Sequence, residues 1–472
     1  MATRGRAKRS RDDDYKFLPL KDAVLCPQQR VNVLGVVTEV GLPWKTKGTD
    51  YVCTLKVVDE SYQTPAVPVN IFALRPAALP KVRAVGDLVQ LSLIKMRLFD
   101  GEAYALFDKM YSSFALYEGK ASVNLRPYQV SSKFNGRDFV IAKDFIELLR
   151  AWQLNFRLNA GVKEYLLSLK EIKEEGKLFD LICKVLLVYK VSENEHVLFV
   201  WDGTDCSPLC IPNKLKDEEQ NPLPLQLEPC LSRDNLCTFP CEGTVFRVVV
   251  KQEYHNCDLS LLRCGGWVKF RNIVSKVQSG MWYGAFSSTS RITLLSDEDN
   301  MVLLCLRDYE ERKSSHLQLS TFPNLSSVTD TDYGDVPCTT LMSLLTHSEV
   351  NTKFKCVVRV VAILPWRVED FYSPVTHKYM LRLTLEDSTA RIHAFVFDKD
   401  GEKFFQGHPS VEELIVKRDR LLGITANDSG VENNTTSRNP PWVECCIKSY
   451  YHRKDDPWGS RQYRVFGTTI KV

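Results

Sequence analysis

The chain has 472 residues and a net charge of +4, from 62 basic and 58 acidic residues. This length suffices for three domains with separate cores, and the near balance of charge excludes a polycation. No apolar run is long enough to cross a membrane, and 15 Cys scattered through strand patterns favour reduced thiols in the cytosol or nucleus.

Residues 1–16 combine a run of basic side chains with three aspartates and show no apolar periodicity. This composition predicts a disordered tail. A nuclear-import signal and a solvated tail without a receptor are both compatible with it.

Residues 17–133 are expected to form the first domain. Gly101 suits a tight hairpin turn, and prolines at positions 76 and 80 interrupt the strand pattern. The expected strands are residues 31–40, 51–58, 67–72, 87–99 and 102–109.

Residues 134–307 are expected to hold a linking helix and the second domain. The helix is predicted from apolar residues at helical spacing between positions 141 and 152. The expected strands of the second domain are residues 179–191, 197–201, 208–211, 244–251, 259–270 and 291–295.

Residues 308–336 lack periodicity, which predicts a linker. The third domain is expected at residues 337–472, with a polar loop at 425–441. Its expected strands are residues 354–364, 379–386, 391–397, 443–451 and 462–471.

One short sequence motif occurs three times in the chain. An apolar strand pattern ends in Asp, and a hydroxyl residue stands two positions later; the pairs are Asp59 with Ser61, Asp202 with Thr204, and Asp387 with Thr389. A leucine-rich turn lies upstream of each copy and aligns Ser168 with Ser343. The spacing between copies is long and unequal, which indicates three domains rather than a short-repeat solenoid.

Each domain thus contains about five strands in a little over a hundred residues. This pattern predicts an all-β protein of three tandem OB folds, which are five-stranded Greek-key barrels, joined by short helices. An SH3-like barrel is the alternative. The extra segment between the third and fourth strands favours the OB fold.

The sequence contains no P-loop, no His-Glu-x2-His and no Gly-x-Ser-x-Gly motif. The best zinc candidates are Cys237, Cys241, Cys257 and Cys264, but their spacing does not match paired Cys-x2-Cys knuckles. We therefore expect no enzymatic activity, no metal and no cofactor.

Aromatic and basic residues share strand faces, and such faces suit base stacking and phosphate contact. Strand alternation places Phe72 opposite a core face formed by Val67, Val69 and Ile71. For any one residue, packing on a neighbour or a solvated strand face is the alternative. The candidate nucleic-acid-binding residues are Trp44, Lys47, Tyr51, Phe72, Lys95, Arg97, Phe99, Trp267, Lys269 and Arg271.

The third strand of the third domain has two distinct faces. One carries Arg391, His393, Phe395 and Phe397, and the other carries Ile392, Ala394 and Val396. Both faces cannot line one small barrel core, so one must meet another element or a partner. Acidic residues at 369–370 and 398–402 argue against a phosphate backbone there, so we predict a protein-docking module.

Several segments resemble the protection-of-telomeres proteins. They are Lys47–Tyr51, Val57–Asp59, Ser112–Gly119, Leu149–Trp152 and Val200–Thr204, and the ending, Pro441–Lys448 with Tyr463–Thr468, resembles the plant members. The likeness covers nearly the whole chain after residue 16. It implies tandem OB domains that bind single-stranded, G-rich telomeric DNA in the nucleus, cap chromosome ends and regulate telomerase.

The family's contact positions, carried over by motif, fall on Lys47, Thr49, Asp50, Phe72, Lys95 and Phe99. Animal members carry basic and aromatic residues after the first strand, where this chain has Thr38–Gly41, and they carry an insertion in the third domain that this chain lacks. The resemblance implies telomerase or other telomere proteins as partners of the third domain, and no membrane. The alternative is a telomerase-associated scaffold with weak or no direct DNA binding.

Overall fold

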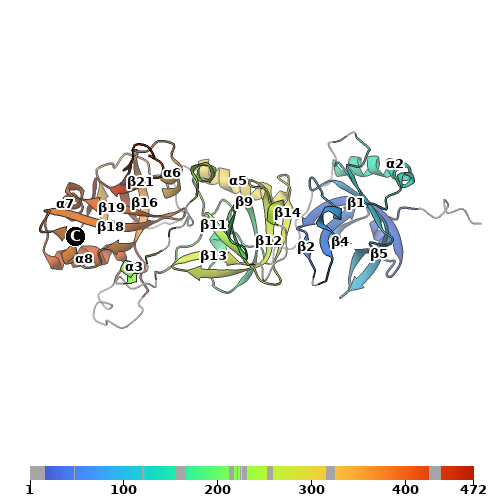
Figure 1. Ribbon diagram of the computed structural model, residues 1–472, viewed down its shortest axis with the longest axis horizontal. Helices are drawn as coiled ribbons and strands as arrows, with labels where there is room; N and C mark the ends of the chain where they lie inside the picture. Colours follow the sequence, from blue (N-terminus) through green and yellow to red (C-terminus); the bar gives the residue numbers. More distant parts are fainter. Residues whose placement is uncertain are drawn as a thin grey trace, which may run out of the picture. The chain divides into compact units, whose positions relative to one another are not determined.

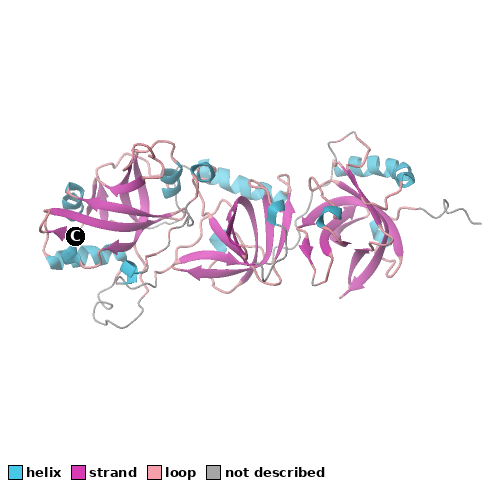
Figure 2. Ribbon diagram, viewed as in Figure 1, coloured by secondary structure: helices cyan, strands magenta, loops and turns pink. Residues whose placement is uncertain are grey.

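The structure is a computed structural model (Figures 1 and 2). It describes residues 16–46, 48–119, 122, 124–154, 165–211, 217–220, 222–223, 225, 231–251, 259–314, 325–424 and 437–471. The described residues fall into two compact units, the first drawn from 1–166, 251–272 and 286–304 and the second from 167–250, 273–285 and 305–472. The predicted basic tail, except Lys16, and most of the predicted loop at 425–441 lie outside the described residues.

The first unit is built around a closed five-stranded barrel. Its strands are β1 (Arg30–Gly41), β3 (Tyr51–Asp59), β4 (Tyr62–Ala73), β5 (Leu88–Phe99) and β6 (Glu102–Phe107). Strand β1 pairs antiparallel with β3 and β5, β3 with β4, and β5 with β6, while β4 runs parallel to β6 and closes the ring. This strand order is that of an OB fold, and it confirms the five strands predicted here.

Further elements surround this barrel. The predicted linking helix is confirmed as α2 (Gly136–Gln153), which buries Ala142 and Ile146 against Leu88 of the barrel and Tyr117 of β7 (Ser113–Tyr117). The other elements are α1 (Leu20–Ala23), β2 (Trp44–Lys45), η1 (Pro76–Ala78), β7 (Ser113–Tyr117), β8 (Gln129–Val130) and α2 (Gly136–Gln153).

A strand expected in the second domain belongs to the first unit. Strand β14 (Arg291–Leu295) pairs with the end of β1, where Val40 lies opposite Leu294. On its other side β14 pairs with residues 267–271, the beginning of β12 (Trp267–Gln278). Residues predicted for two domains therefore share one sheet within the first unit.

The second unit contains a ring of strands in the order β13-β11-β10-β9-β12, with β12 also paired to β13. Strand β11 runs parallel to β13, so the order again matches the OB fold. The elements are η2 (Leu169–Glu171), β9 (Leu178–Ser192), β10 (Glu195–Trp201), α3 (Asp217–Gln220), α4 (Arg233–Leu236), β11 (Phe246–Lys251), η3 (Leu259–Leu261) and β13 (Met281–Ala285).

The prediction of a strand at residues 208–211 was wrong. Within that segment only Ile211 forms a β-bridge, with Arg438, and β11 takes the place of the third strand. Pro208 has no N–H to donate to a ladder, and the carbonyl oxygen of Leu209 accepts a hydrogen bond from Arg359 instead. The predicted strand at 259–270 begins as the turn η3 and becomes strand only at Trp267.

The second unit also contains a closed barrel in the last third of the chain. Its strands are β16 (Lys353–Leu364), β18 (Lys378–Glu386), β19 (Arg391–Phe397), β20 (Val443–Tyr451) and β21 (Arg461–Val465). They follow the order β16-β20-β21-β19-β18, with β16 also paired to β18 and β19 parallel to β21. The accompanying elements are α6 (Leu341–Thr346), η4 (Val368–Asp370), β17 (Tyr372–Ser373), α7 (Lys399–Phe405) and α8 (Val411–Leu422).

The predicted linker at residues 308–336 was wrong in part. Helix α5 (Asn300–Ser314) extends into its beginning, and β15 (Thr329–Thr331) near its end pairs with β22 (Thr468–Ile470). Strand β15 is too short for a periodic pattern, and its partner lies at the far end of the chain. The pairing was therefore invisible to local sequence reasoning.

The two faces of β19 separate as predicted, with one correction. Ile392, Ala394 and Val396 lie in the barrel core. Arg391 does not share an open face, because its side chain is fully buried in a salt bridge to Glu386. Glu386 also pairs with Arg359 at 2.5 Å. Although burial acts against it, the two guanidinium groups hold the pKa of Glu386 below its usual range.

The repeated aspartate has a structural role in the first barrel. Oδ2 of Asp59 accepts a hydrogen bond at 2.7 Å from the backbone N–H of Leu20, in the turn that precedes β1. Oδ1 accepts hydrogen bonds from the backbone N–H groups of Ser61 and Tyr62. One carboxylate thus ties the start of the barrel to the turn between its second and third strands.

The same tether recurs in both later copies. Asp202 accepts from the N–H of Leu169 at 2.7 Å, and Asp387 accepts from the N–H of Leu341 at 2.7 Å. The counterpart of Ser168 is therefore Thr340 rather than Ser343, because the loop that follows the turn is three residues longer in the last copy.

Replacement of each repeated aspartate by asparagine tests this tether. In Asp59→Asn, Asp202→Asn and Asp387→Asn the side-chain NH2 group faces a backbone N–H, which is left without an acceptor. Each variant should lose about 1–3 kcal/mol of unfolding free energy, measured by urea denaturation. The exposed neighbour Glu60 supplies the control Glu60→Gln, which should leave stability unchanged. Equal stability of the aspartate variants and the control would contradict the tether.

Candidate nucleic-acid interface

The outer face of the first barrel carries a transverse row of half-buried side chains. Lys95 on β5 lies opposite Leu106 on β6, and Leu106 lies beside Asn70 on β4. Asn70 lies opposite Thr54 on β3, and their side-chain oxygens are 2.8 Å apart. This row crosses four strands and leaves the Lys95 ammonium at one end.

Phe72 lies on the same face as this row. It stands two residues after Asn70 on β4 and opposite Val52 on β3, and its ring is half-buried. Val69 and Ile71, on the other face of the strand, are buried in the core. The predicted alternation is therefore confirmed, and the ring is positioned to contact a ligand on the outer face. Tyr51, another candidate, packs partly against the core.

The loop between β1 and β3 is held down by several contacts. The backbone N–H of Thr46 donates to the carbonyl oxygen of Asp50 at 2.9 Å, and the Asp50 carboxylate pairs with Lys109 at 2.8 Å. The guanidinium of Arg291 lies 5.0 Å from the centre of the Trp44 ring. Thr49 is exposed, and Lys47 lies outside the described residues.

The hairpin between β5 and β6 presents an open aromatic ring. Asp100 and Gly101 form its two-residue turn, and both have positive φ, at 49° and 81°. Phe99, directly before the turn, is 76% exposed. Arg97 lies opposite Tyr104 on the same hairpin. An exposed aromatic ring beside a cation suits base stacking with phosphate contact.

The structure brings Lys269 and Arg271 into the first unit. Both lie half-buried on β12, where they face Thr293 and Arg291 of β14. Trp267, predicted on the same open face, is only 4% exposed. Burial of its large ring removes apolar surface from water, so the ring offers no free face to a base.

Glu39 pairs with one cation of β3 and with one cation of β12. Its Oε1 lies 3.1 Å from Nζ of Lys56, and its Oε2 lies 2.9 Å from the guanidinium of Arg271. Lys56 was missed by sequence reasoning, although it alternates with Thr54 on β3. Lys109 and Arg291 were missed because only tertiary contacts bring them to the loop. The face is thus basic, but several of its cations are already paired with carboxylates.

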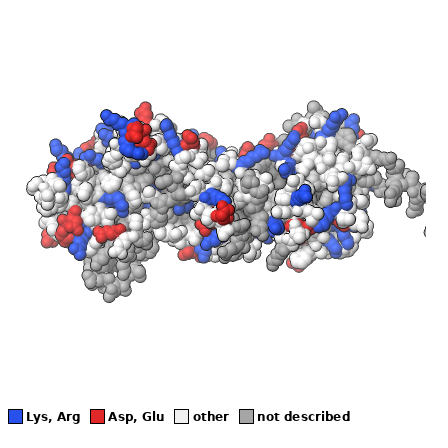
Figure 3. Space-filling model, viewed as in Figure 1, with Lys and Arg blue, Asp and Glu red and all other residues white. Residues whose placement is uncertain are grey.

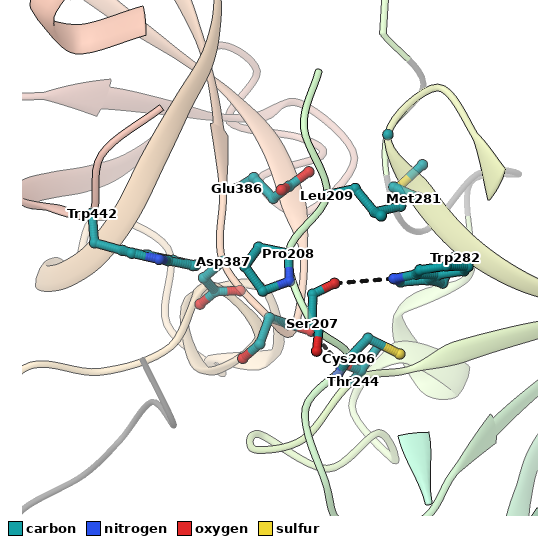
Figure 4. A pocket seen from close by; sticks show the side chains of 12 residues that line it. Cys206, Ser207, Pro208, Leu209, Thr244, Met281, Trp282, Glu386, Asp387 and Trp442 are labelled. Carbon is teal, nitrogen blue, oxygen red and sulfur yellow. Dashed lines mark hydrogen bonds between the residues drawn. The ribbon is translucent and has the colours of Figure 1, made fainter. Parts of the chain in front are cut away.

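A pocket in the second unit contains acidic side chains (Figure 4). Asp387 lies there, but its oxygens accept the backbone hydrogen bonds of the tether. Glu386 is held by its two arginines. The Nε1–H of Trp282 donates to the carbonyl oxygen of Ser207 at 3.1 Å. The carboxylates of this pocket are therefore committed to structural contacts.

Those zinc candidates that the structure describes do not gather into a site. Among the residues that the structure describes, no three His, Cys, Asp or Glu side chains are placed to hold a metal ion. Cys237 and Cys241 instead lie near Thr346, and Cys257 lies outside the described residues. None of the described helices is long and apolar enough to cross a membrane.

Comparison with known proteins gives two family matches. A family described as telomeric single stranded DNA binding POT1/CDC13 matches residues 11–154, and a POT1A-like OB fold domain matches residues 324–456. Protection of telomeres protein 1a of Arabidopsis thaliana is 36% identical over 472 residues, which cover 96% of this chain and 98% of that protein. Protection of telomeres protein 1b of Arabidopsis thaliana is 36% identical over 469 residues, which cover 98% of this chain and 99% of that protein. The chain belongs to the protection-of-telomeres family.

The match to an animal member of the protection-of-telomeres family is shorter. Protection of telomeres protein 1 of Homo sapiens is 28% identical over 176 residues, which cover 37% of this chain and 26% of that protein. The full-length matches to the Arabidopsis proteins agree with the plant-like ending recognised in the sequence.

Truncation of Phe72 distinguishes a ligand-stacking ring from a packing ring. Phe72→Ala should weaken single-strand binding by about 1–3 kcal/mol per stacked base and leave the melting temperature nearly unchanged. Leu74→Ala, which shortens an exposed apolar side chain just after β4, is the matched control. If the ring only packs against the protein, Phe72→Ala should instead cost about 3–5 kcal/mol of unfolding free energy. The affinity of the folded molecules for single strands would then be unchanged.

Proposed function

We propose that this protein binds single-stranded, G-rich telomeric DNA on the outer face of its first unit. One observation carries the proposal: the strand register places Lys95, Asn70 and Phe72 on one barrel face. That face lies within residues 11–154, which match the telomeric single-strand-binding family. Bases stack on Phe72 and on the open ring of Phe99, while Lys95 and Arg97 contact phosphates.

The cations of β12 extend this face. Lys269 and Arg271 reach it through β14, which pairs with the end of β1. A strand of nucleotides that crosses β4 and β3 toward β14 meets Lys56 and then Arg271. The loop at 44–51 borders this path, as the corresponding loop does in OB folds. We infer one continuous site from residues that the sequence assigned to two domains.

We infer from this binding a role at chromosome ends. A protein that holds the single-stranded terminus shields it from other enzymes and controls the access of telomerase to it. The names of the two Arabidopsis relatives, both protection of telomeres proteins, agree with this role. The protein then acts in the nucleus as a binding protein without its own catalysis.

We extend the proposal to a telomere-protein partner of the third barrel. Helix α8 exposes Val411, Ile415 and Val416 on its surface. An apolar stripe of this kind suits docking to another telomere protein or to the telomerase ribonucleoprotein. Deletion of residues 337–472 is a poor test, because Thr244 Oγ1 donates to the carbonyl oxygen of Ser388 and the cut would expose this buried contact.

A second candidate function is that of a telomerase-associated scaffold with weak DNA binding. The ion pairs of the first unit favour it, because Lys56 and Arg271 are engaged by Glu39, and Lys109 is engaged by Asp50. A phosphate must compete with these carboxylates for each cation. The affinity of the first unit for single strands decides between the two functions.

Neutralisation of Glu39 tests the competition directly. Glu39→Gln should release Lys56 and Arg271 toward phosphates, tighten single-strand binding several-fold and steepen its salt dependence by about 0.7 in log–log slope for each new contact. Stability should change little, since ion pairs that remain partly solvated contribute about 0–1 kcal/mol. Fluorescence anisotropy over a salt series measures both quantities, with Glu60→Gln as control. Unchanged affinity in Glu39→Gln would show that these cations lie off the DNA path.

The proposed function is tested with the purified full-length chain. It should bind G-rich telomeric single strands far more tightly than duplex or C-rich strands of the same length. Lys95→Ala should weaken binding to all single strands and reduce the salt slope by about 0.7. Equal, weak binding to every nucleic acid, together with co-purification with telomerase, would instead establish the scaffold function.

A further inference from the structure

The repeated aspartate provides a common register for the first and third barrels. In the first barrel Phe72 lies opposite Val52, seven residues before Asp59. In the third barrel Phe397 lies opposite Met380, seven residues before Asp387. Phe397 therefore occupies the position of Phe72.

The correspondence continues across the other strands. In the first barrel the row runs from Lys95 through Leu106 and Asn70 to Thr54. In the third barrel the matching row runs from Lys448 on β20 through Arg464 on β21 and Phe395 on β19 to Arg382 on β18. Lys448 therefore occupies the position of Lys95, and the positions of Leu106, Asn70 and Thr54 hold two arginines and a phenylalanine.

These side chains are outside the core of the third barrel. Phe395, Phe397, Arg382, Lys448 and Arg464 are all half-buried, while the alternate residues of β18 and β19 fill the core. Met380, opposite Phe397, is 63% exposed. The face therefore offers two aromatic rings and an apolar side chain to a ligand.

Two cations, Lys378 and Arg464, lie close to the Phe397 ring. Nζ of Lys378 lies 5.5 Å from the ring centre, and the guanidinium of Arg464 lies 5.7 Å from it. The row extends to Lys353 on β16, which lies opposite Lys448. Rings flanked by cations match the two needs of a single strand, a surface for base stacking and charge for phosphates.

The acidic residues that argued against a phosphate backbone are accounted for in part. Asp400 pairs with Nε of Arg464 at 2.5 Å. Glu402, also on α7, has its carboxylate 3.9 Å from Nε2 of His408. Lys448 and Lys353 add two further positive charges to this row.

We propose that this face of the third barrel is a second binding site for single-stranded nucleic acid. Phe397 and Phe395 stack on bases, and Arg382, Lys448 and Lys353 contact the phosphate backbone. Stacking and phosphate contact are common to DNA and RNA, so the chemistry admits either strand. The site goes beyond the proposed function, because it uses residues of another barrel and does not require the first face to bind.

The test uses the full-length chain with the first face weakened by Phe72→Ala and Lys95→Ala. In this background we compare Phe397→Ala and Lys448→Glu, with Val411→Ala and Arg420→Glu on α8 as controls. The probes are a labelled telomeric single-stranded DNA and an RNA of the same sequence, read by fluorescence anisotropy over a salt series. Melting temperatures establish that each variant is folded.

We expect residual binding in the background. Phe397→Ala should weaken it by about 5- to 150-fold, which corresponds to one stacked base. Lys448→Glu, a surface substitution that does not disturb the core, should weaken it and flatten the salt slope by about 0.7. If these variants lose affinity for both the DNA and the RNA probe, the face binds through base stacking and phosphate contacts. If they lose affinity for the RNA probe alone, the face also recognises the 2′-hydroxyl group.

Two results would overturn the proposal. One is a background protein that binds neither probe. The other is residual binding that Phe397→Ala and Lys448→Glu leave as strong as the α8 controls do. Neither result bears on the first face, whose function is measured separately in the chain with an intact Phe72 and Lys95.

Discussion

A buried carboxylate at the end of the second barrel strand organises each repeat. Asp59, Asp202 and Asp387 each bind the backbone N–H of a leucine in the turn before the first strand. A buried N–H without an acceptor is costly, so the turn and the strand end must stay together. The same carboxylates accept N–H groups of the next turn, and in the first and third barrels this turn leads directly into the third strand.

This fixed starting point determines which side chains face outward. Strand residues alternate between core and surface, so a one-residue slip would exchange the two sets. The tether therefore protects the outward positions of Phe72 and Phe397, at the same distance along their barrels. One structural constraint thus sets the outward face of both barrels, while the side chains of each face differ.

Charge on the first face is balanced rather than simply positive. Glu39 holds cations from β3 and β12, and Asp50 holds Lys109. These pairs orient long side chains before a ligand arrives, but each must open for a phosphate to bind. Because both charges are partly solvated, the exchange is small in free energy and sensitive to salt. A modest net charge of +4 is thus compatible with a nucleic-acid-binding face.

The sequence by itself determined the strands of the first and third barrels, helix α2, the repeated Asp-x-hydroxyl motif and the outward placement of Phe72 and Lys95, because strand alternation and an Asp-x-hydroxyl turn are local patterns. It did not show β13, which closes the second barrel. Only the tertiary structure decided that Arg271 meets Glu39, 232 residues away, that Trp267 and Arg391 are buried, and that residues 208–211 do not form a strand. These outcomes depend on which distant segments pair, and the periodicity of one segment contains no information about its partner.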